Sequence, residues 1–205
     1  MTDDQSTLDK QHKEAMAQIQ AHHRTKLKQK RAAEHGLILV HTGHGKGKST
    51  SAFGVIARAL GWGQKVAVVQ FIKGDWKTGE KEFFSRFEDQ LDWFTMGEGF
   101  TWDVQDRQKD IAAATQGWER AKEVMTSGDY KLVVLDELNI ALLMDYLPID
   151  EVIAGLKAHH SETSVVITGR DAPDEIIEIA DTATEMRQIK HAFDAGIKAV
   201  PGLDY

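Results

Sequence analysis

Residues 41–50 read HTGHGKGKST and directly follow a short apolar run, LILV, at residues 37–40. Glycine at positions 43, 45 and 47 permits a tight turn whose backbone N–H groups point inward, where they can surround an anion. A helix that begins near Lys48 would add the positive end of its dipole. The stretch therefore predicts a phosphate-binding loop between a strand and a helix.

This loop departs from the usual phosphate-loop pattern G-x-x-x-x-G-K-[ST], because Thr42 stands where the first glycine belongs. In the usual pattern the lysine reaches the β- and γ-phosphates and the next hydroxyl binds magnesium, and Lys48 and Ser49 occupy those positions. The alternative is a plain glycine-rich connection, which the preceding strand and the Lys-Ser-Thr ending disfavour. We expect the nucleotide to be bound by Thr42, Gly43, His44, Gly45, Lys46, Gly47, Lys48, Ser49 and Thr50.

Outward from the loop, short apolar runs alternate with amphipathic stretches. Residues 66–72, 132–135 and 164–168 are apolar on both faces, as are strands that are covered above and below. Residues 91–96 and 184–189 are weaker strand candidates. In residues 106–126 the apolar and small side chains have the spacing of one helix face. Strands that alternate with helices predict an α/β domain with a mostly parallel sheet and helices on both faces.

A second acidic motif follows one of the predicted strands: residues 132–138 read LVVLDEL. In phosphate-loop NTPases an acidic residue at the end of a strand helps to hold magnesium, so Asp136 and Ser49 are the predicted metal-site residues. Glu137 is expected to polarise a nucleophile or contact the nucleotide. The alternative is a strand that ends in two solvated carboxylates. Together, the loop and this motif predict binding of ATP or GTP with Mg²⁺, or alternatively with Mn²⁺. They do not indicate which bond of the nucleotide breaks.

The chain has 205 residues, no cysteine and a net charge of −7. Residues 1–35 contain no glycine or proline and few apolar side chains, which predicts a helical or flexible arm that lies over the domain or a neighbouring subunit. Residues 36–205 form the predicted nucleotide-binding domain, whose charge of −9 disfavours binding to nucleic acid. The polar N-terminus and the lack of a long apolar run favour a cytoplasmic protein with no membrane association.

Four stretches narrow the function further: residues 41–54 (HTGHGKGKSTSAFG), 68–80 (VVQFIKGDWKTGE), 97–103 (GEGFTWD) and 167–205. Together they resemble the corrinoid adenosyltransferases of bacterial B12 synthesis and salvage, and the similarity extends from about residue 36 to the end. His44 and Ser49 depart from the asparagine and threonine that are usual in that family. Serine keeps the hydroxyl for magnesium, whereas His44 places a titratable ring beside the phosphates.

The resemblance implies a RecA-like phosphate-loop NTPase fold and a specific reaction. A Co(I) corrinoid attacks the 5′ carbon of ATP, takes the 5′-deoxyadenosyl group and releases triphosphate, in adenosylcobalamin biosynthesis or salvage. Lys48, Glu137 and Arg170 match the expected catalytic positions, with Arg170 at the phosphates, and Arg58 matches an arginine near the ribose. A solvated helix residue is an equal alternative for Arg58.

The resemblance also implies contacts with the corrinoid and with other proteins. Phe100 and Trp102 are expected to pack against the cobalt face and displace its lower axial ligand; from composition alone, core positions would be favoured for both. A reduced flavin or flavoprotein is the implied electron donor, and a homodimer is the implied assembly. The competing hypotheses are a phosphoryl-transfer enzyme that produces ADP, a RecA-like ATP switch that recruits nucleic acid, and a corrinoid sensor with slow turnover.

Overall fold

The computed structural model describes residues 2–28, 30, 33–72, 78–96 and 107–204. The chain divides into two compact units, Met1–Glu34 and His35–Tyr205. The first unit is formed around one helix, α1 (Thr2–Lys28), whose sequence contains no helix-breaking residue. Among the helices that the structure describes, none combines the length and the apolar character needed to span a bilayer.

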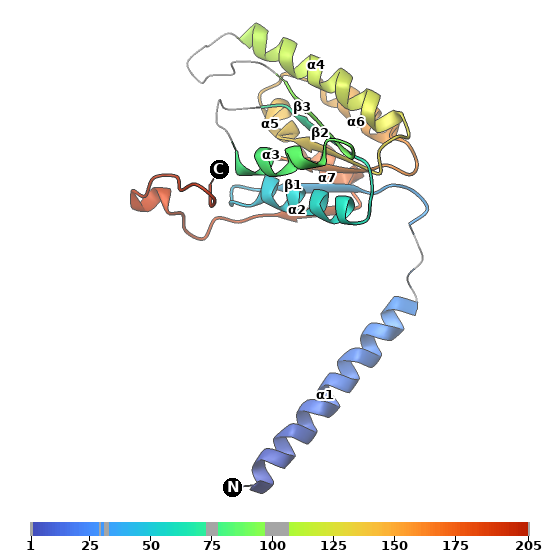
Figure 1. The fold of residues 1–205 in the computed structure, drawn as a ribbon, viewed down its shortest axis with the longest axis vertical. Helices are drawn as coiled ribbons and strands as arrows, with labels where there is room; N and C mark the ends of the chain where they lie inside the picture. The colour runs from blue at the N-terminus through green and yellow to red at the C-terminus, as the bar shows by residue number, and fades with distance from the viewer. Residues whose placement is uncertain (1, 29, 31–32, 73–77, 97–106, 205) are drawn as a thin grey trace. The chain divides into compact units, whose positions relative to one another are not determined.

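The second unit is organised around a six-stranded sheet in the order β3-β2-β4-β5-β1-β6, in which every described pair is parallel (Figure 1). The predicted α/β fold with a parallel sheet is confirmed. The strand β5 lies between β1, which precedes the glycine loop, and β4, which ends in an acidic residue. The strands are β1 (Ile38–Thr42), β2 (Val66–Gln70), β3 (Leu91–Thr95), β4 (Leu132–Asp136), β5 (Ser164–Thr168) and β6 (Thr182–Glu185).

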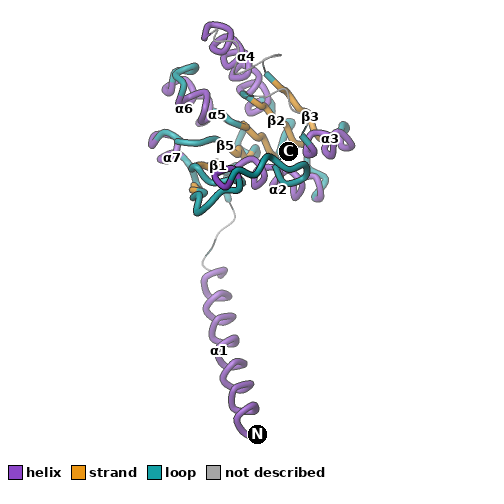
Figure 2. The backbone as a smooth tube through the Cα atoms, turned by 90° about the vertical axis from the view of Figure 1, so that its left-hand side faces the viewer, coloured by secondary structure: helices purple, strands orange, loops and turns teal. Residues whose placement is uncertain are grey.

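Helices connect the strands and cover both faces of the sheet, as Figures 1 and 2 show. Helix α2 follows the glycine loop directly and begins at Lys48, as the sequence predicts. Pro148 and Pro173 each precede a helix that has two acidic residues in its first turn. The negative charges of these residues interact favourably with the positive end of the helix dipole. The helices are α2 (Lys48–Gly61), α3 (Gly79–Phe84), η1 (Ser85–Phe87), α4 (Arg107–Thr126), α5 (Leu138–Leu143), α6 (Ile149–Lys157), α7 (Asp174–Ile179) and η2 (Phe193–Ala195).

The core has two layers because successive side chains of each strand point to opposite faces of the sheet. In β2, Val66 and Val68 pack with α2, while Ala67 and Val69 pack with the layer of α4 to α7. All four side chains are fully buried. The strands are therefore apolar on both faces because both faces are covered, as their continuous apolar runs predict.

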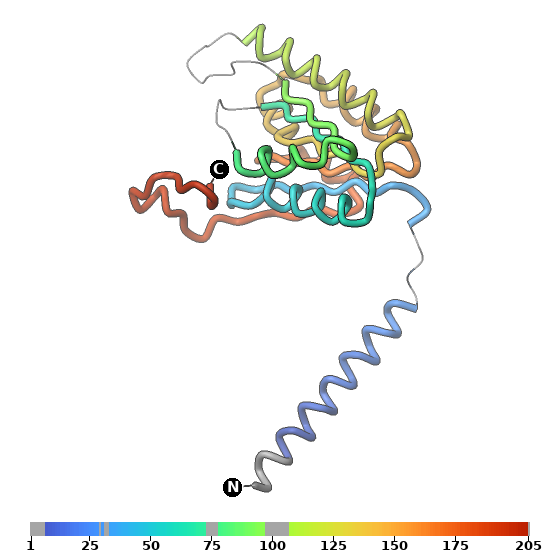
Figure 3. Tube along the Cα trace, viewed as in Figure 1, coloured from blue at the N-terminus to red at the C-terminus, as the bar shows by residue number. Residues whose placement is uncertain are grey.

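The parallel arrangement gathers the carboxyl ends of the strands at one edge of the sheet. Register pairs Gln70 with Asp136, the last residues of β2 and β4, and pairs Thr168, the last residue of β5, with His41, which lies one residue before the end of β1. Beyond β6 the chain runs through η2 to its C-terminal end, which lies beside α2 and α3 in both views of the backbone (Figures 2 and 3). Ligands of parallel α/β sheets bind at this edge, so it is where a functional site is expected.

Candidate functional site

The glycine loop owes its shape to two physical demands on the backbone. Gly43 and Gly47 have φ angles of 92° and 117°, a left-handed conformation that disfavours other residues. A Cβ atom at Gly43 or at Gly45 would lie 2.6 Å from the carbonyl oxygen of Met186, which extends β6 along the loop. Positions 43 and 45 are therefore glycine because the chain after β6 lies against the loop.

The same contact changes one expectation about the loop. The N–H of Gly45 donates a hydrogen bond to the Met186 carbonyl oxygen at 2.6 Å, so it does not point inward as the sequence predicts for the loop amides. Thr42, which replaces the usual first glycine, has a structural role. Its hydroxyl accepts a hydrogen bond from the N–H of Ala172 at 3.0 Å and so ties the segment after Arg170 to the loop.

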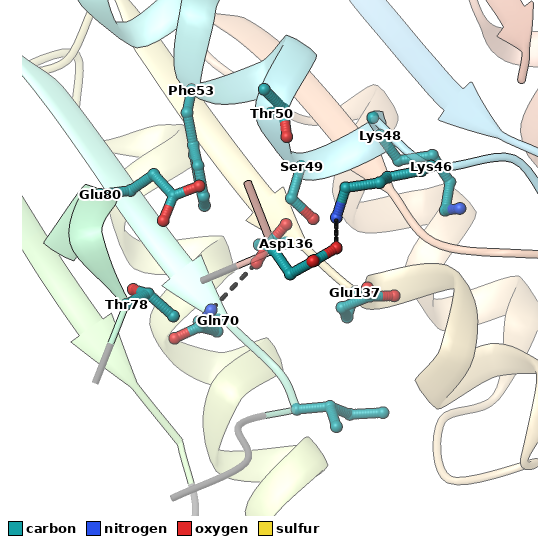
Figure 4. Close-up of a pocket in the computed structure, with 13 residues that line it drawn as sticks. Lys46, Lys48, Ser49, Thr50, Phe53, Gln70, Thr78, Glu80, Asp136 and Glu137 are labelled. Atoms are coloured by element: carbon teal, nitrogen blue, oxygen red, sulfur yellow. Dashed lines mark hydrogen bonds and ion pairs between the residues drawn. The ribbon is translucent and has the colours of Figure 1, made fainter. Parts of the chain in front are cut away.

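A pocket of about 290 Å³ lies between the loop and the carboxyl ends of β2 and β4 (Figure 4). Gly47 caps the start of α2 without a side chain, which leaves the first N–H groups of this 14-residue helix available to an anion. The pocket is lined by Lys46, Gly47, Lys48, Ser49, Thr50, Phe53, Gln70, Ile72, Thr78, Glu80, Asp136, Glu137 and Asp204.

Lys48 is buried at the start of α2, with 8% of its surface exposed. Its Nζ donates a hydrogen bond to the carbonyl oxygen of Gly45 at 2.9 Å, so the lysine folds back over its own loop. Burial lowers the pKa of Lys48, and the nearby Glu137 carboxylate opposes that shift. An anionic ligand in the pocket would stabilise the charged ammonium in the same way.

Asp136 ends β4 and is nearly fully buried. One oxygen accepts a hydrogen bond from the Gln70 amide at 3.0 Å (Figure 4). The other accepts one from the Thr168 hydroxyl at 2.8 Å. Burial raises the pKa of Asp136, and hydrogen bonds from Thr168, Gln70 and Ser49 act in the opposite direction. The carboxylate thus has a fixed orientation beside the Ser49 hydroxyl.

Glu137 is held in a conformation that is unfavourable for its type. Its φ angle of 61° is left-handed, and one carboxylate oxygen is buried without a hydrogen-bond partner. Burial, and next the charge of Asp136, raise its pKa from 4.5 to about 7. Strain and an unpaired buried polar atom together indicate a group that is arranged for a ligand.

The donor set of this pocket suits magnesium. Ser49 and Asp136 supply hard oxygen atoms side by side, and Glu137 contributes a further oxygen without a partner. Within the described ranges no three acidic, histidine or cysteine side chains form a metal cage. That combination fits Mg²⁺, which is commonly bound through one or two carboxylates together with substrate phosphates and water.

Seven of the predicted site residues line the pocket: Lys46, Gly47, Lys48, Ser49, Thr50, Asp136 and Glu137. Arg170 follows β5 and acts electrostatically on both Lys48 and Glu137. Nε2 of His44 lies 3.0 Å from the Asp171 carboxylate, both side chains are exposed, and His44 does not line the pocket. Arg58 is exposed in the last turn of α2, roughly 15 Å along the helix axis from Lys48, and does not line the pocket. Phe100 and Trp102 lie outside the described residues.

Several residues of the site were not predicted. Gln70, Thr168 and Asp204 each contact a predicted site residue through a side chain. Gln70 and Thr168 could have been found, because each is polar at the carboxyl end of an otherwise apolar strand. Asp204 had no such signal, since it lies 158 positions from its partner Lys46.

A second pocket of about 380 Å³ adjoins the first and shares Thr50, Phe53 and Glu80 with it. Its remaining lining is mostly apolar: Gly79, Phe83, Phe84, Gly202 and Leu203. A ligand with an anionic part and an apolar part can therefore span the two pockets.

Comparison with known proteins gives a consistent result. Residues 34–205 match the family model of ATP:corrinoid adenosyltransferase BtuR/CobO/CobP. A corrinoid adenosyltransferase of Pseudomonas aeruginosa is 53% identical over 96% of this chain and 97% of that protein. Those of Sinorhizobium sp. and Escherichia coli K12 are 47% and 46% identical, over 90% and 84% of this chain and 92% and 87% of their own lengths.

Among solved structures, the flagellar accessory protein FlaH of Methanocaldococcus jannaschii superposes with a TM-score of 0.47 at 14% identity. The superposition covers 75% of this chain and 72% of that chain.

Proposed function

The chain belongs to the ATP:corrinoid adenosyltransferase family, and we propose that its glycine loop and the adjoining carboxylates carry out the family's reaction on ATP and a corrinoid. In that reaction the Co(I) electron pair forms a bond to the 5′ carbon of the ribose. The bond between this carbon and its oxygen breaks, and triphosphate leaves with the electrons. The enzyme is thus a transferase that makes adenosylated corrinoids.

One observation carries the assignment of residues: Lys46, Lys48 and the open start of α2 all face one pocket. The reaction creates negative charge on the leaving triphosphate, so fixed positive groups at that position favour the transition state. Lys48 and Arg170 would hold the phosphates, and the remainder of residues 42–50 would position them. Glu137 would accept hydrogen bonds from the nucleotide through its unpaired oxygen.

Magnesium is proposed to be held at Ser49 and Asp136. The bound ion supplies positive charge that offsets the charge of the triphosphate. The Gln70 and Thr168 side chains keep the Asp136 carboxylate turned toward the Ser49 hydroxyl. The fixed carboxylate limits the reorganisation that ion binding requires.

The remaining partners are proposed on the family resemblance and on exposed surface. Phe100 and Trp102 are proposed to contact the corrinoid, and a reduced flavin or flavoprotein to supply the electron. The C-terminal segment exposes five large apolar side chains, which supports its burial in a homodimer; they are Ile189, Phe193, Ile197, Val200 and Leu203. A cytoplasmic location is proposed because both ATP and the reductant are available there.

The test is product analysis with ATP, Mg²⁺ and a chemically reduced corrinoid. We expect triphosphate and an adenosylated corrinoid in equal amounts, and ADP as the main product would refute the proposal. The Lys48→Ala variant should lose about 100-fold or more in kcat/KM, because it removes a charged contact to the leaving group. Lys131→Ala, which changes a surface lysine paired with Glu162, is the matched control and should remain active.

A further inference from the structure

The C-terminal end of the chain contributes a charge to the phosphate pocket. The Asp204 carboxylate accepts a hydrogen bond from Nζ of Lys46 at 2.6 Å, which makes it an ion pair with a residue of the glycine loop. Both residues line the pocket, as do Lys48 and Ser49. The Asp204 carboxylate is thus paired with the Lys46 ammonium, which lies where the triphosphate is proposed to bind.

Asp204 is held in place by a turn of the chain. Its second carboxylate oxygen accepts a hydrogen bond from the N–H of Val200 at 2.8 Å, and its own N–H donates to the Val200 carbonyl oxygen at 2.9 Å. Within this turn Pro201 restricts the backbone and Gly202 adopts a φ angle of 80°. The hydrogen bonds from Lys46 and Val200 lower the pKa of Asp204, so the carboxylate is ionised at neutral pH.

The turn also contributes to the neighbouring apolar pocket. Gly202 and Leu203 line that pocket together with Phe53, Phe83 and Phe84. The last described residues of the chain therefore contribute to both pockets, which makes them part of the nucleotide site and not only of the surface.

A triphosphate and an ionised carboxylate cannot both bind the Lys46 ammonium closely without repelling one another. We propose that Asp204 competes with the triphosphate for Lys46, so that the C-terminal turn releases the lysine when nucleotide binds and pairs with it again when triphosphate leaves. Asp204 thereby weakens retention of the product polyanion. This inference rests on the proposed binding of triphosphate by residues 42–50.

The test measures binding of inorganic tripolyphosphate with Mg²⁺ by titration calorimetry, in the full chain. Asp204→Asn should bind it about threefold to tenfold more tightly than the unmodified chain, the range expected for a partly exposed charge pair. Glu162→Gln removes an equal charge from a surface pair with Lys131 at the opposite end of β4 and β5, and should leave the affinity unchanged. Unchanged or weaker binding by Asp204→Asn would overturn the inference.

A second pair of variants separates competition for Lys46 from a general effect of charge. In a Lys46→Ala background, Asp204→Asn should have little further effect on tripolyphosphate affinity, because the cation over which the two anions compete is gone. Equal tightening in both backgrounds would show that Asp204 does not act through Lys46. If the unmodified chain binds neither tripolyphosphate nor ATP, the proposed function itself fails, which is a distinct result.

Discussion

At the scale of single residues, Glu137 is a proposed binding group whose conformation and burial lower the stability of the folded protein. It has a left-handed φ angle, a buried oxygen without a partner and a pKa raised to about 7. Each of these features is unfavourable in the folded protein without ligand. Groups of this kind lie at functional sites because the ligand, and not the fold, satisfies them.

The raised pKa of Glu137 makes a prediction about stability. Because this pKa is about 7 in the folded chain and 4.5 when unperturbed, the folded state binds more protons between those values, and stability falls as pH rises through that window. Glu137→Gln removes the ionisation and should raise the free energy of unfolding by about 2–3 kcal/mol at pH 8. At pH 4 the two proteins should be nearly equal. Urea unfolding at both pH values measures this, and an equal difference at both would contradict it.

At the scale of elements, the site depends on how neighbouring strand ends are connected. The hydroxyl of Thr168, at the end of β5, donates to Asp136 and accepts a hydrogen bond from the N–H of Glu137 at 2.9 Å. The Thr168 side chain therefore holds both acidic residues at the end of β4, Asp136 and Glu137. The extension of β6 similarly determines which loop positions must be glycine, through the close approach of Met186.

We predict that Thr168→Val weakens the site through this connection. The substitution keeps the shape of the side chain but leaves two buried groups without partners, which should destabilise the fold by about 1–3 kcal/mol. It should also raise the Mg²⁺ concentration required for half-maximal ATP binding. Thr168→Ser, which retains the hydroxyl, should restore most of both properties. An equally raised Mg²⁺ requirement in the serine variant would point to packing and not to the hydroxyl.

At the scale of the whole molecule, the core and the pockets belong to one of the two units. The buried residues of both core layers all lie between Ile38 and Ile176, and the residues that line the two site pockets lie between Lys46 and Asp204. No described residue of the first unit, Met1–Glu34, is among these core and pocket residues. We therefore expect the second unit to fold without the arm.

Deletion of residues 1–34 should consequently leave the second unit folded. We expect its Tm in thermal unfolding to stay within about 4 °C of that of the full chain, because no core contact is removed and the change in stability is below about 1 kcal/mol. ATP binding should persist. A chain that is unfolded without these residues would show that the arm contributes to the fold of the second unit.

The sequence by itself determined the parallel α/β fold and the loop that begins at the end of β1. Apolar runs on both faces require covering layers, and a glycine turn before Lys48 and Ser49 suits few structures other than a phosphate site. Local patterns of this kind are readable because they act between near neighbours in the chain.

Only the tertiary structure decided which distant residues complete the site. Thr168 contacts Asp136 from 32 positions further along the chain, and Asp204 reaches the pocket from 158 positions beyond Lys46. The close approach of Met186 to Gly45, and the distance of Arg58 from the pocket, likewise follow from packing. The physical reason is that hydrogen bonds and charge pairs depend on separation in space, which strand order and the path of the C-terminal segment fix and which spacing along the chain does not.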